Sequence, residues 1–454
     1  MITGQIIKRL PPLLRSKIEN DYELRNILGN INWLTAGIIF KDIVGLFVIA
    51  WVARYLGPEQ FGLMNYAIAF VVLFSSLSTL GLDNIVIRNI LLRPDQKFKY
   101  IESAFILKLL GSLLMLLLSS VVIYILQPEN SLVRIFVLIV GFGYIFKAFD
   151  VIDFFFQSKV EARYSVYARS LSFIVVSLIK IILILTQAPL ISFILMFSLD
   201  LLVTAILLIY FYFKREAKSI FRKHITVDTM KELIRDSWPL FLSGIAVTIY
   251  SKIDQIMIGN LLGDRELGLY SSAAKLSEAW YFIPAVIMSS VFPSILRAKK
   301  KSKELYLKRM QLLYDVFVIF TLVIAFLVTI ASPLIIRILY GNEYIEAANV
   351  LSIHIWAGPA VFLGVASGSY LVAENLTKVA LMRTFVGAVI NIVSNIILIP
   401  SFGIEGAAIS TLISYSFATI FVIFPSDARI VGLSILKSFN IFRLVKLFQR
   451  KAIV

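Results

Sequence analysis

The stretch GIIFKDIVGLFVIAWVARYLG, residues 37–57, is long and apolar enough to span a lipid bilayer as a helix. The hydrocarbon core of a bilayer is about 30 Å thick and requires roughly 20 predominantly apolar residues. Two charged residues, Lys41 and Asp42, interrupt this run. A charge at the bilayer centre costs about 2.5–3.5 kcal/mol on insertion scales. The stretch therefore predicts a membrane-spanning helix whose charged side chains face water or an opposite charge instead of lipid.

The composition of the whole chain is typical of an integral membrane protein. Of its 454 residues, 59% are hydrophobic and 16% are charged, whereas about 25% of the residues in a soluble domain are charged. The chain has no cysteine, which excludes disulfides and thiolate metal sites. Its 2 histidines, His224 and His354, lie far apart in sequence, which disfavours a histidine-based metal site or catalytic triad. We therefore expect no catalytic residue, no metal site and no cofactor.

Twelve apolar segments predict twelve transmembrane helices, so we expect an all-α integral membrane protein. With approximate boundaries, the segments are residues 32–54, 62–81, 102–126, 132–156, 164–186, 188–213, 238–262, 268–294, 312–336, 349–373, 379–400 and 404–424.

The basic residues between these segments predict the orientation of the chain, because lysine and arginine collect in cytoplasmic loops. With the N-terminus inside, the inner segments hold 34 of the 44 basic residues. The outer loops then hold 4, which are Arg54, Arg134, Arg265 and Arg337. This asymmetry predicts that both termini are cytoplasmic. It also places the net charge of +16 at a membrane surface, so we expect no nucleic-acid partner.

A short motif recurs at matching places in the two halves of the chain. The segments LGPEQFGL, residues 56–63, and LGDRELGL, residues 262–269, are related by a shift of 206 residues. Each half would contain six spans that begin on the same side of the membrane. The repeat therefore predicts two parallel-repeat six-helix bundles around a central cavity, which is an alternating-access transporter design.

These features divide the chain into four parts. Residues 1–213 form the predicted N-terminal bundle with a cytoplasmic arm, and residues 214–237 form a cytoplasmic linker. Residues 238–424 form the C-terminal bundle. Residues 425–454 form a cytoplasmic tail with an amphipathic helix that we expect to lie on the inner leaflet.

Four segments of the chain resemble the polysaccharide-unit flippases of the multidrug/oligosaccharidyl-lipid/polysaccharide exporter superfamily. They occur in the same order as in that family, and the resemblance covers nearly the whole chain. The segments are ARYLGPEQFGLMNYAIAF at residues 53–70, GLDNIVIRN at 81–89, LYGNEYIEAANVL at 339–351 and NIVSNIILIPSFGIEGAAISTLIS at 391–414.

The resemblance implies a flippase in the plasma membrane of a bacterium or an archaeon, serving the synthesis of a surface polysaccharide such as O-antigen. The substrate it implies is an oligosaccharide unit on a polyprenyl pyrophosphate carrier, moved from the inner to the outer leaflet. Membrane lipids, a coupling proton or sodium ion and a polysaccharide polymerase are the further partners that we expect.

Charged residues inside the predicted spans are the candidate substrate-binding residues. Facing lipid, they would each be costly, so they must face a watery cavity, pair with one another or reach an interface. The candidates are the following six lysines and six acids: Lys41, Lys108, Lys147, Lys180, Lys252, Lys275, Asp42, Asp150, Asp153, Asp200, Asp254 and Glu278.

Spacing sorts these charges into groups, because residues three apart share a helix face. One group on the fourth span contains Lys147, Asp150 and Asp153, and another on the eighth span contains Lys275 and Glu278. The pairs Lys41–Asp42 and Lys252–Asp254 lie on the matching first helices of the two halves, which border the cleft in a parallel-repeat design. We expect at least one member of the Lys41–Asp42 pair to face the cleft opposite Asp254 or Lys252.

Charge complementarity suggests roles for these groups. The carrier pyrophosphate is anionic, so we expect Lys41, Lys252 and Lys275 to compensate its charge, and Arg88 to capture it at the cytoplasmic entrance. The acids would balance the lysines in the empty site, bind sugar hydroxyls or carry the coupling ion; these are Asp42, Asp150, Asp254 and Glu278. Trp280 and Tyr281 are candidates for stacking on a sugar. The competing interpretation is that the charges form salt bridges that only fix helix packing.

Two other functions fit parts of the sequence. A multidrug or cation antiporter of the same superfamily would share the architecture, but its cavity should be net acidic. A membrane polysaccharide polymerase or lipid-sugar transferase would need a large outer loop to carry its catalytic groups. The longest outer connection, around residues 337–348, is only about a dozen residues long, which argues against an enzyme.

The orientation can be tested with reporter fusions. Reporters at residues 225 and 305 should report a cytoplasmic location, and one at residue 342 an external location, because the first two lie in basic segments. Any inversion among the three would contradict the predicted topology.

Overall fold

All regular structure in the described part of the protein is helical. The computed structural model describes residues 22–216 and 225–440. In these ranges nine helices are long and apolar enough to cross a membrane, or ten if Phe40–Leu73 and Ser75–Leu92, bent by 50°, form one broken span. The expectation of an all-α, multi-pass membrane protein is confirmed.

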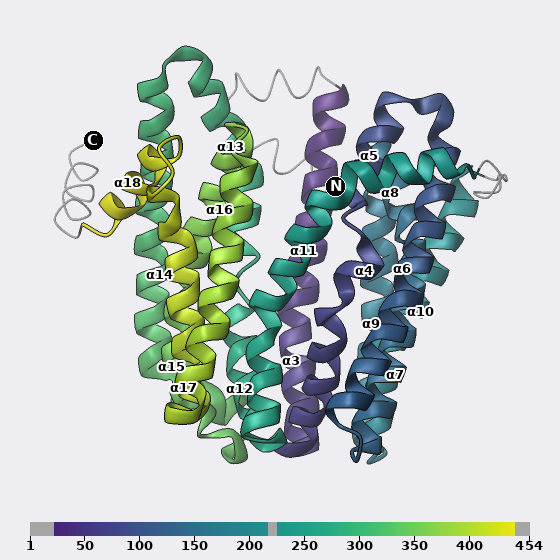
Figure 1. Cartoon of the computed structure of the whole chain (residues 1–454), viewed down its shortest axis with the longest axis vertical. Helices are drawn as coiled ribbons and strands as arrows, with labels where there is room; N and C mark the ends of the chain where they lie inside the picture. Colours follow the sequence, from purple (N-terminus) through teal and green to yellow (C-terminus); the bar gives the residue numbers. More distant parts are fainter. Residues whose placement is uncertain (1–21, 217–224, 441–454) are drawn as a thin grey trace. The chain divides into compact units, whose positions relative to one another are not determined.

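The helices follow one another along the chain as shown in Figure 1. They are α3 (Tyr22–Leu73), α4 (Ser75–Thr79), α5 (Asp83–Leu92), α6 (Lys97–Leu126), α7 (Ser131–Gly143), α8 (Val151–Ser158), α9 (Arg163–Leu185), α10 (Leu190–Glu216), α11 (Val227–Leu261), α12 (Asp264–Glu278), α13 (Ile283–Lys301), α14 (Lys303–Leu339), α15 (Ala347–His354), α16 (Gly358–Ala373), α17 (Thr377–Ile420) and α18 (Arg429–Ser438). Short 3₁₀ helices lie between them: η1 (Pro94–Gln96), η2 (Tyr144–Asp150), η3 (Asn342–Tyr344), η4 (Ile355–Ala357) and η5 (Phe421–Ile423).

The described helices form two compact units, each with its own core. The first unit contains the described residues up to Val48 together with Phe70–Ile245, and the second contains Ile49–Ala69 and the described residues from Ala246 onwards. In the first unit, α7 packs between α6 and α10, and α9 packs on α10 (Figure 1). In the second unit, α16 packs against both α14 and α17 (Figure 1). Both cores are rich in buried aromatic side chains.

Two helices contribute to both compact units. Residues 49–69 of α3 belong to the second unit, and residues 227–245 of α11 belong to the first. In the first unit, Leu233 of α11 is part of the core, and Glu232 forms a 2.9 Å ion pair with Arg93. The predicted bundles were divided only at the linker, residues 214–237, whereas the compact units also exchange these two helical segments. A long helix can pack with its sequence neighbours along one part of its length and with other helices along the rest.

Glycines interrupt the two longest helices near the predicted boundaries between spans. Gly57 in α3 has φ 72° and ψ 168°, and Gly403 in α17 has φ 59° and ψ −139°. Only glycine adopts such positive φ values without strain. Gly57 lies between the predicted spans 32–54 and 62–81, and Gly403 lies between 379–400 and 404–424. The chain turns sharply at the second break and brings Gly406 against the backbone of Leu398. A Cβ on Gly406 would lie only 2.1 Å from the carbonyl oxygen of Leu398.

The repeated glycine motifs contact each other reciprocally within the second unit. A Cβ on Gly62 would lie 1.7 Å from the carbonyl oxygen of Asp264, and a Cβ on Gly268 would lie 1.9 Å from the carbonyl oxygen of Pro58. Positions 58 and 264, like 62 and 268, are related by the shift of 206 residues. A contact in which each motif touches the equivalent position of the other is typical of a local two-fold relation. The two motifs are thus structurally equivalent as well as similar in sequence.

The start of the predicted tail packs on the second unit. Gln311 of α14 donates hydrogen bonds to the carbonyl oxygen of Ser434, at 2.9 Å, and to the hydroxyl of Ser438, at 3.1 Å. Ile435 is buried, whereas Leu436 and Phe439 are exposed. The rest of the predicted amphipathic tail, residues 441–454, lies outside the described residues, as do residues 217–224 of the linker and residues 1–21 of the N-terminal arm.

Substitution of Gly268 by alanine should test the close contact of the two motifs. Gly268→Ala is expected to destabilise the protein by about 1–3 kcal/mol, the range typical of overpacked cores, because the new methyl group would overlap Pro58. The measurement is thermal unfolding in detergent. Gly45→Ala is the matched control, since its Cβ would meet Phe173 at an ordinary 3.6 Å and alanine favours a helix. Equal unfolding temperatures for the two variants would contradict the close contact.

Candidate functional site

Charged residues of the first unit gather around Arg169 of α9. The guanidinium of Arg169 donates to Oδ1 of Asp150 and to Oδ2 of Asp153, both at 3.1 Å. Gln157 donates to the same oxygen of Asp153, also at 3.1 Å. The two acids share a face as predicted, because η2 leads directly into α8 and side chains three residues apart align in both types of helix. One arginine thus bridges two of the candidate acids.

Two lysines of the first unit lie over aromatic rings. The ammonium of Lys147 lies 5.2 Å from the centre of the Tyr144 ring, and that of Lys108 lies 4.9 Å from the centre of the Phe154 ring. Lys108 also forms a 3.4 Å ion pair with Asp83, and its side chain is only 1% exposed. Aromatic faces stabilise a nearby cation through their quadrupole, so each of these lysines has a favourable contact for its charge within the protein.

The remaining candidates of the first unit lie on α3 and α5. Lys41 is exposed and Asp42 is half-buried. Arg88 is exposed and donates to Asp236 of α11 and to Asn89. Arg88 therefore lies at the segment of α11 that belongs to the first unit. The expected pairing of Lys41 or Asp42 with Lys252 or Asp254 stays a prediction.

Asp254 is the most buried of the candidate acids in the second unit, with 6% of its surface exposed. Its Oδ2 accepts a hydrogen bond from the hydroxyl of Tyr270, and its Oδ1 accepts one from the backbone N–H of Gln255 at 2.8 Å. The Tyr270 hydroxyl also lies 3.3 Å from the hydroxyl of Thr411 in α17. The carboxylate is thus held by polar groups from α11 and α12, with α17 adjoining. Burial of a carboxylate in a span requires such partners.

Lys275 and Glu278 lie at the C-terminal end of α12. The Lys275 ammonium donates to Oδ1 of Asn65 at 2.7 Å and lies 4.8 Å from the centre of the Phe61 ring. Glu278 is half-buried and is the last residue of α12. Lys275 therefore binds residues of the 49–69 segment, which gives it a packing role in this conformation.

Two arginines belong to this set of intramembrane charges but were counted with the inner segments in the sequence. Arg169 lies seven positions into α9, and Arg383 lies seven positions into α17. Both stand close to a predicted span boundary, where hydropathy does not tell a loop from the first turns of a helix. A basic residue a few positions inside a predicted span is the signal that could have identified them.

Arg383 lines a cavity of about 240 Å³ inside the second unit. Its guanidinium donates to the hydroxyl of Ser367 at 2.9 Å and to the carbonyl oxygen of Gly364 at 3.0 Å. Three tyrosines also line the cavity, including Tyr281, one of the two aromatic residues singled out in the sequence. The lining residues are Tyr250, Tyr281, Ala360, Val361, Gly364, Val365, Arg383, Thr384, Tyr415, Ala418 and Thr419.

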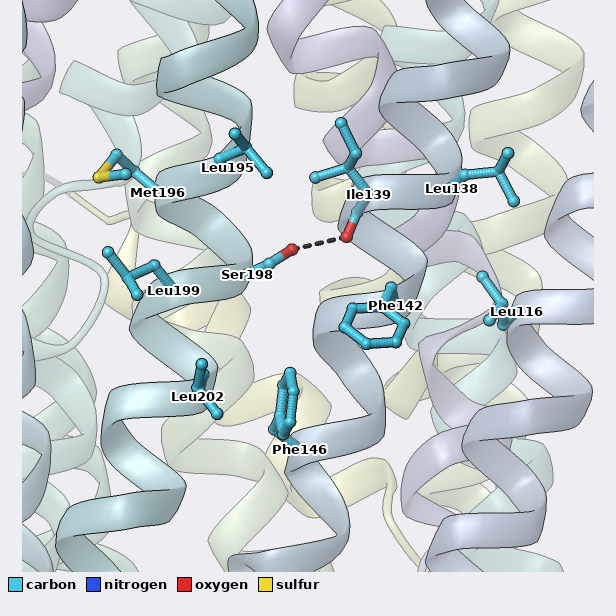
Figure 2. A pocket seen from close by; sticks show the side chains of 10 residues that line it. All are labelled: Leu116, Leu138, Ile139, Phe142, Phe146, Leu195, Met196, Ser198, Leu199 and Leu202. Carbon is cyan, nitrogen blue, oxygen red and sulfur yellow. Dashed lines mark hydrogen bonds between the residues drawn. The ribbon is translucent and has the colours of Figure 1, made fainter.

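A larger groove of about 520 Å³ in the first unit has a different character. Figure 2 shows its lining of aliphatic and aromatic side chains from α6, α7, η2 and α10, with Phe142 of α7 and Phe146 of η2 at its centre. The hydroxyl of Ser198 donates to the carbonyl oxygen of Ile139 at 2.6 Å, so its hydrogen bond is used within the protein. Since no charged residue lines this groove, it suits hydrocarbon and not a polar headgroup. Within residues 22–216 and 225–440, no three histidines or acids gather in a metal-binding cluster.

A family model described as polysaccharide biosynthesis protein matches residues 27–299, more than half of the chain. The chain belongs to this polysaccharide biosynthesis protein family. A second model, MatE, matches residues 239–397, so the second half of this chain is also similar to that group. The family resemblance expected from the four segments is confirmed.

Two relatives carry names that bear on function. A putative O-antigen transporter from Shigella flexneri is 23% identical over 403 residues, which cover 85% of this chain and 94% of that protein. The probable low-salt glycan biosynthesis flippase Agl15 from Haloferax volcanii is 29% identical over 183 residues. That second alignment covers 39% of this chain and 38% of the relative, well under half of its length.

Solved structures share the fold at low sequence identity. The lipid II flippase MurJ, in an inward closed conformation, superposes with a TM-score of 0.70 at 17% identity, covering 90% of this chain and 92% of MurJ. An inward-facing MATE multidrug transporter superposes with a TM-score of 0.64 at 13% identity, covering 89% of this chain and 94% of that one. The chain therefore shares the fold of these two transporters.

Proposed function

We propose that the protein is a flippase, not an enzyme, and that it moves a polyprenyl-pyrophosphate-linked oligosaccharide unit from the inner to the outer leaflet of a prokaryotic plasma membrane. Membership of the polysaccharide biosynthesis family is the observation that carries this proposal. The names of the O-antigen transporter and of the glycan flippase Agl15 support the same substrate class. A polymerase that joins the exported units is the protein partner that we expect.

The architecture that we propose has twelve spans in two six-helix bundles around a central cavity. Ten spans follow from the helices that are long and apolar enough, with the bent pair counted as one. Dividing α3 at Gly57 and α17 at Gly403 brings the number to twelve, in agreement with the hydropathy of the sequence. Both termini are then cytoplasmic, because the basic residues between spans collect on that side.

The polar path that we propose combines the charged residues of α3 and α11 with alternating access. The carrier pyrophosphate has to cross a region in which an isolated charge is costly. Lys41 and Lys252 lie on the matching first helices of the two halves and compensate it there. Arg88 receives the headgroup at the cytoplasmic entrance and exchanges its contact with Asp236 for a phosphate oxygen.

The other candidates have supporting roles in this proposal. Asp150 and Asp153, bridged by Arg169, form a polar network in the N-terminal bundle, and Lys147 on the same helical segment adds a positive charge to it. Asp42 and Glu278 balance the lysines when no substrate is present. Lys275 exchanges its contact with Asn65 for substrate during the transport cycle.

A cation antiporter is the second candidate function, because the MatE model and a MATE transporter are similar to this chain. A cavity that selects cations should be lined by acids. The cavity of the second unit is instead lined by Arg383 and three tyrosines. This lining favours an anionic substrate and makes the antiporter the weaker candidate.

Flipping can be measured in liposomes that carry a lipid-linked oligosaccharide on the inner leaflet. Wild-type protein should expose the sugar to an added sugar-modifying enzyme. The variants Lys41→Ala and Lys252→Ala should insert and fold but no longer expose the sugar, because the negative charge of the pyrophosphate is then not compensated during its passage. Lys378→Ala is the control, since Lys378 is exposed at the start of α17. Normal exposure by both lysine variants would reject the assignment of these lysines. Wild-type protein that exposes no sugar but exports cationic drugs would favour the antiporter.

Asp254 is our candidate for the residue that carries a coupling proton or sodium ion. It is buried, the Tyr270 hydroxyl donates to it, and the Thr411 hydroxyl lies 3.3 Å from that of Tyr270, so further oxygen atoms are close to the carboxylate. Protonation of this carboxylate, or binding of a sodium ion to it, would change the packing among α11, α12 and α17. Such a coupling of binding to packing is what an ion-driven transporter requires.

Asp254→Asn should separate coupling from transport. In the liposome assay, an imposed proton or sodium gradient should accelerate flipping by the wild-type protein, and Asp254→Asn should remove this acceleration because an amide neither titrates nor attracts a cation. Tyr270→Phe keeps the carboxylate and should retain part of the response. A full gradient response in Asp254→Asn, or none in the wild type, would contradict coupling at this residue.

A further inference from the structure

We propose that the cavity lined by Arg383, Tyr250, Tyr281 and Tyr415 in the second unit is a subsite for an oxyanion next to a sugar ring. The oxyanion is either a substituent of the sugar, such as a uronate carboxylate, or the phosphate that links the sugar to its carrier. This inference rests on the proposed flippase function and identifies a part of the substrate that the protein recognises.

The hydrogen bonds of Arg383 do not neutralise its positive charge, so the charge is available to an anionic ligand. Both acceptors that it finds in the described part of the chain, the Ser367 hydroxyl and the Gly364 carbonyl oxygen, are neutral. By contrast, Arg169 of the first unit bridges two carboxylates. A guanidinium has five N–H donors, so three remain for a ligand once these two bonds are made. A planar guanidinium suits carboxylate and phosphate oxygens because it can donate two parallel hydrogen bonds.

The backbone of α16 makes room for this guanidinium. A Cβ on Gly368 would lie 2.9 Å from Nη2 of Arg383, and Gly364, one turn earlier, lines the cavity itself. The guanidinium therefore lies directly against α16 and is held by it. A group that is fixed before the ligand arrives loses little conformational entropy on binding.

The tyrosines supply a surface that suits a sugar. The rings of Tyr250 and Tyr415 meet edge to face, with centres 4.5 Å apart. The hydroxyl of Tyr281 is buried beside Ser277 but does not complete a hydrogen bond within the described residues. Tyrosine combines an apolar ring with a polar tip, so the ring faces can pack against the C–H groups of a sugar while the hydroxyls bind its oxygens.

The size and position of the cavity limit what it can hold. Small-molecule pockets typically enclose about 300–1,000 Å³, so a cavity of about 240 Å³ fits one sugar ring with its adjoining oxyanion instead of a whole oligosaccharide. Arg383 lies six residues beyond Thr377, roughly 9 Å along the helix at 1.5 Å per residue. In the orientation proposed above, this depth is on the cytoplasmic side of the membrane centre, where the substrate is loaded.

Binding to the full-length protein in nanodiscs tests the subsite. The two probes are a short-chain prenyl pyrophosphate that carries a neutral hexose and the same lipid that carries a hexuronate. Arg383→Gln should weaken hexuronate binding at least tenfold, and its thermal unfolding is measured in parallel. The matched control is Arg309→Gln, because Arg309 also donates to a serine hydroxyl and a carbonyl oxygen, those of Ser294, but is exposed. It should change binding of neither probe.

The pattern across the two probes identifies the oxyanion. A loss confined to the hexuronate lipid would assign the subsite to the sugar substituent, and an equal loss for both lipids would assign it to the linking phosphate. Val365→Glu is a second variant, and it keeps Arg383. The new carboxylate would lie in the cavity lining and neutralise the guanidinium, so this variant should weaken binding of the same probe.

Two outcomes would overturn the proposal, and they are distinguishable. If the wild type binds both lipids and neither variant changes the affinity, Arg383 only ties α16 to α17 and the subsite is wrong. If the wild type binds neither lipid, the proposed flippase function fails, and the subsite fails with it.

Discussion

The cost of placing charge in a low-dielectric membrane is the constraint on which this structure depends. Each ionised side chain in a span needs a partner, an aromatic face or access to water. The protein uses a different solution at each site. Arg169 bridges Asp150 and Asp153, Asp254 accepts hydrogen bonds from Tyr270 and a backbone N–H, and Arg383 donates to neutral oxygens. The first two solutions satisfy a charge within the protein, whereas the third leaves a charge that a ligand can use.

Close backbone contact is the second physical theme of the molecule. The two glycine motifs touch at equivalent positions, where any side chain would overlap a carbonyl oxygen. Gly368 plays a similar part beside Arg383, and small residues at helix interfaces generally allow such an approach in membranes. Van der Waals packing and polar contacts must hold these helices together, because lipid is as apolar as their side chains.

The proposed function joins these two themes. Close glycine contacts give the two repeat motifs a tightly packed meeting point inside the second unit, next to the bond between Lys275 and Asn65. In our proposal, charges on α3 and α11 offer the anionic carrier a path, and the tyrosine-lined cavity offers its sugar a recognition site. The apolar groove of Figure 2 is unsuited to either part and fits hydrocarbon instead. Polar and apolar parts of an amphiphilic substrate would thus find separate surfaces on the same protein.

The sequence by itself determined that this is an all-helical membrane protein, that spans meet near Gly57 and Gly403, and which glycines repeat. It could do so because hydropathy and the backbone preference of glycine are local properties. It also identified most of the intramembrane charges, including Asp254 and Lys275. Only the tertiary structure decided their partners: Tyr270 for Asp254, Asn65 for Lys275, and neutral oxygens for Arg383. The roles of Arg169 and Arg383 were hidden because both lie near a span boundary. The direction of a side chain and the neighbour it meets depend on how helices rotate and pack, and residues 65 and 275 are brought together by packing that no local pattern encodes.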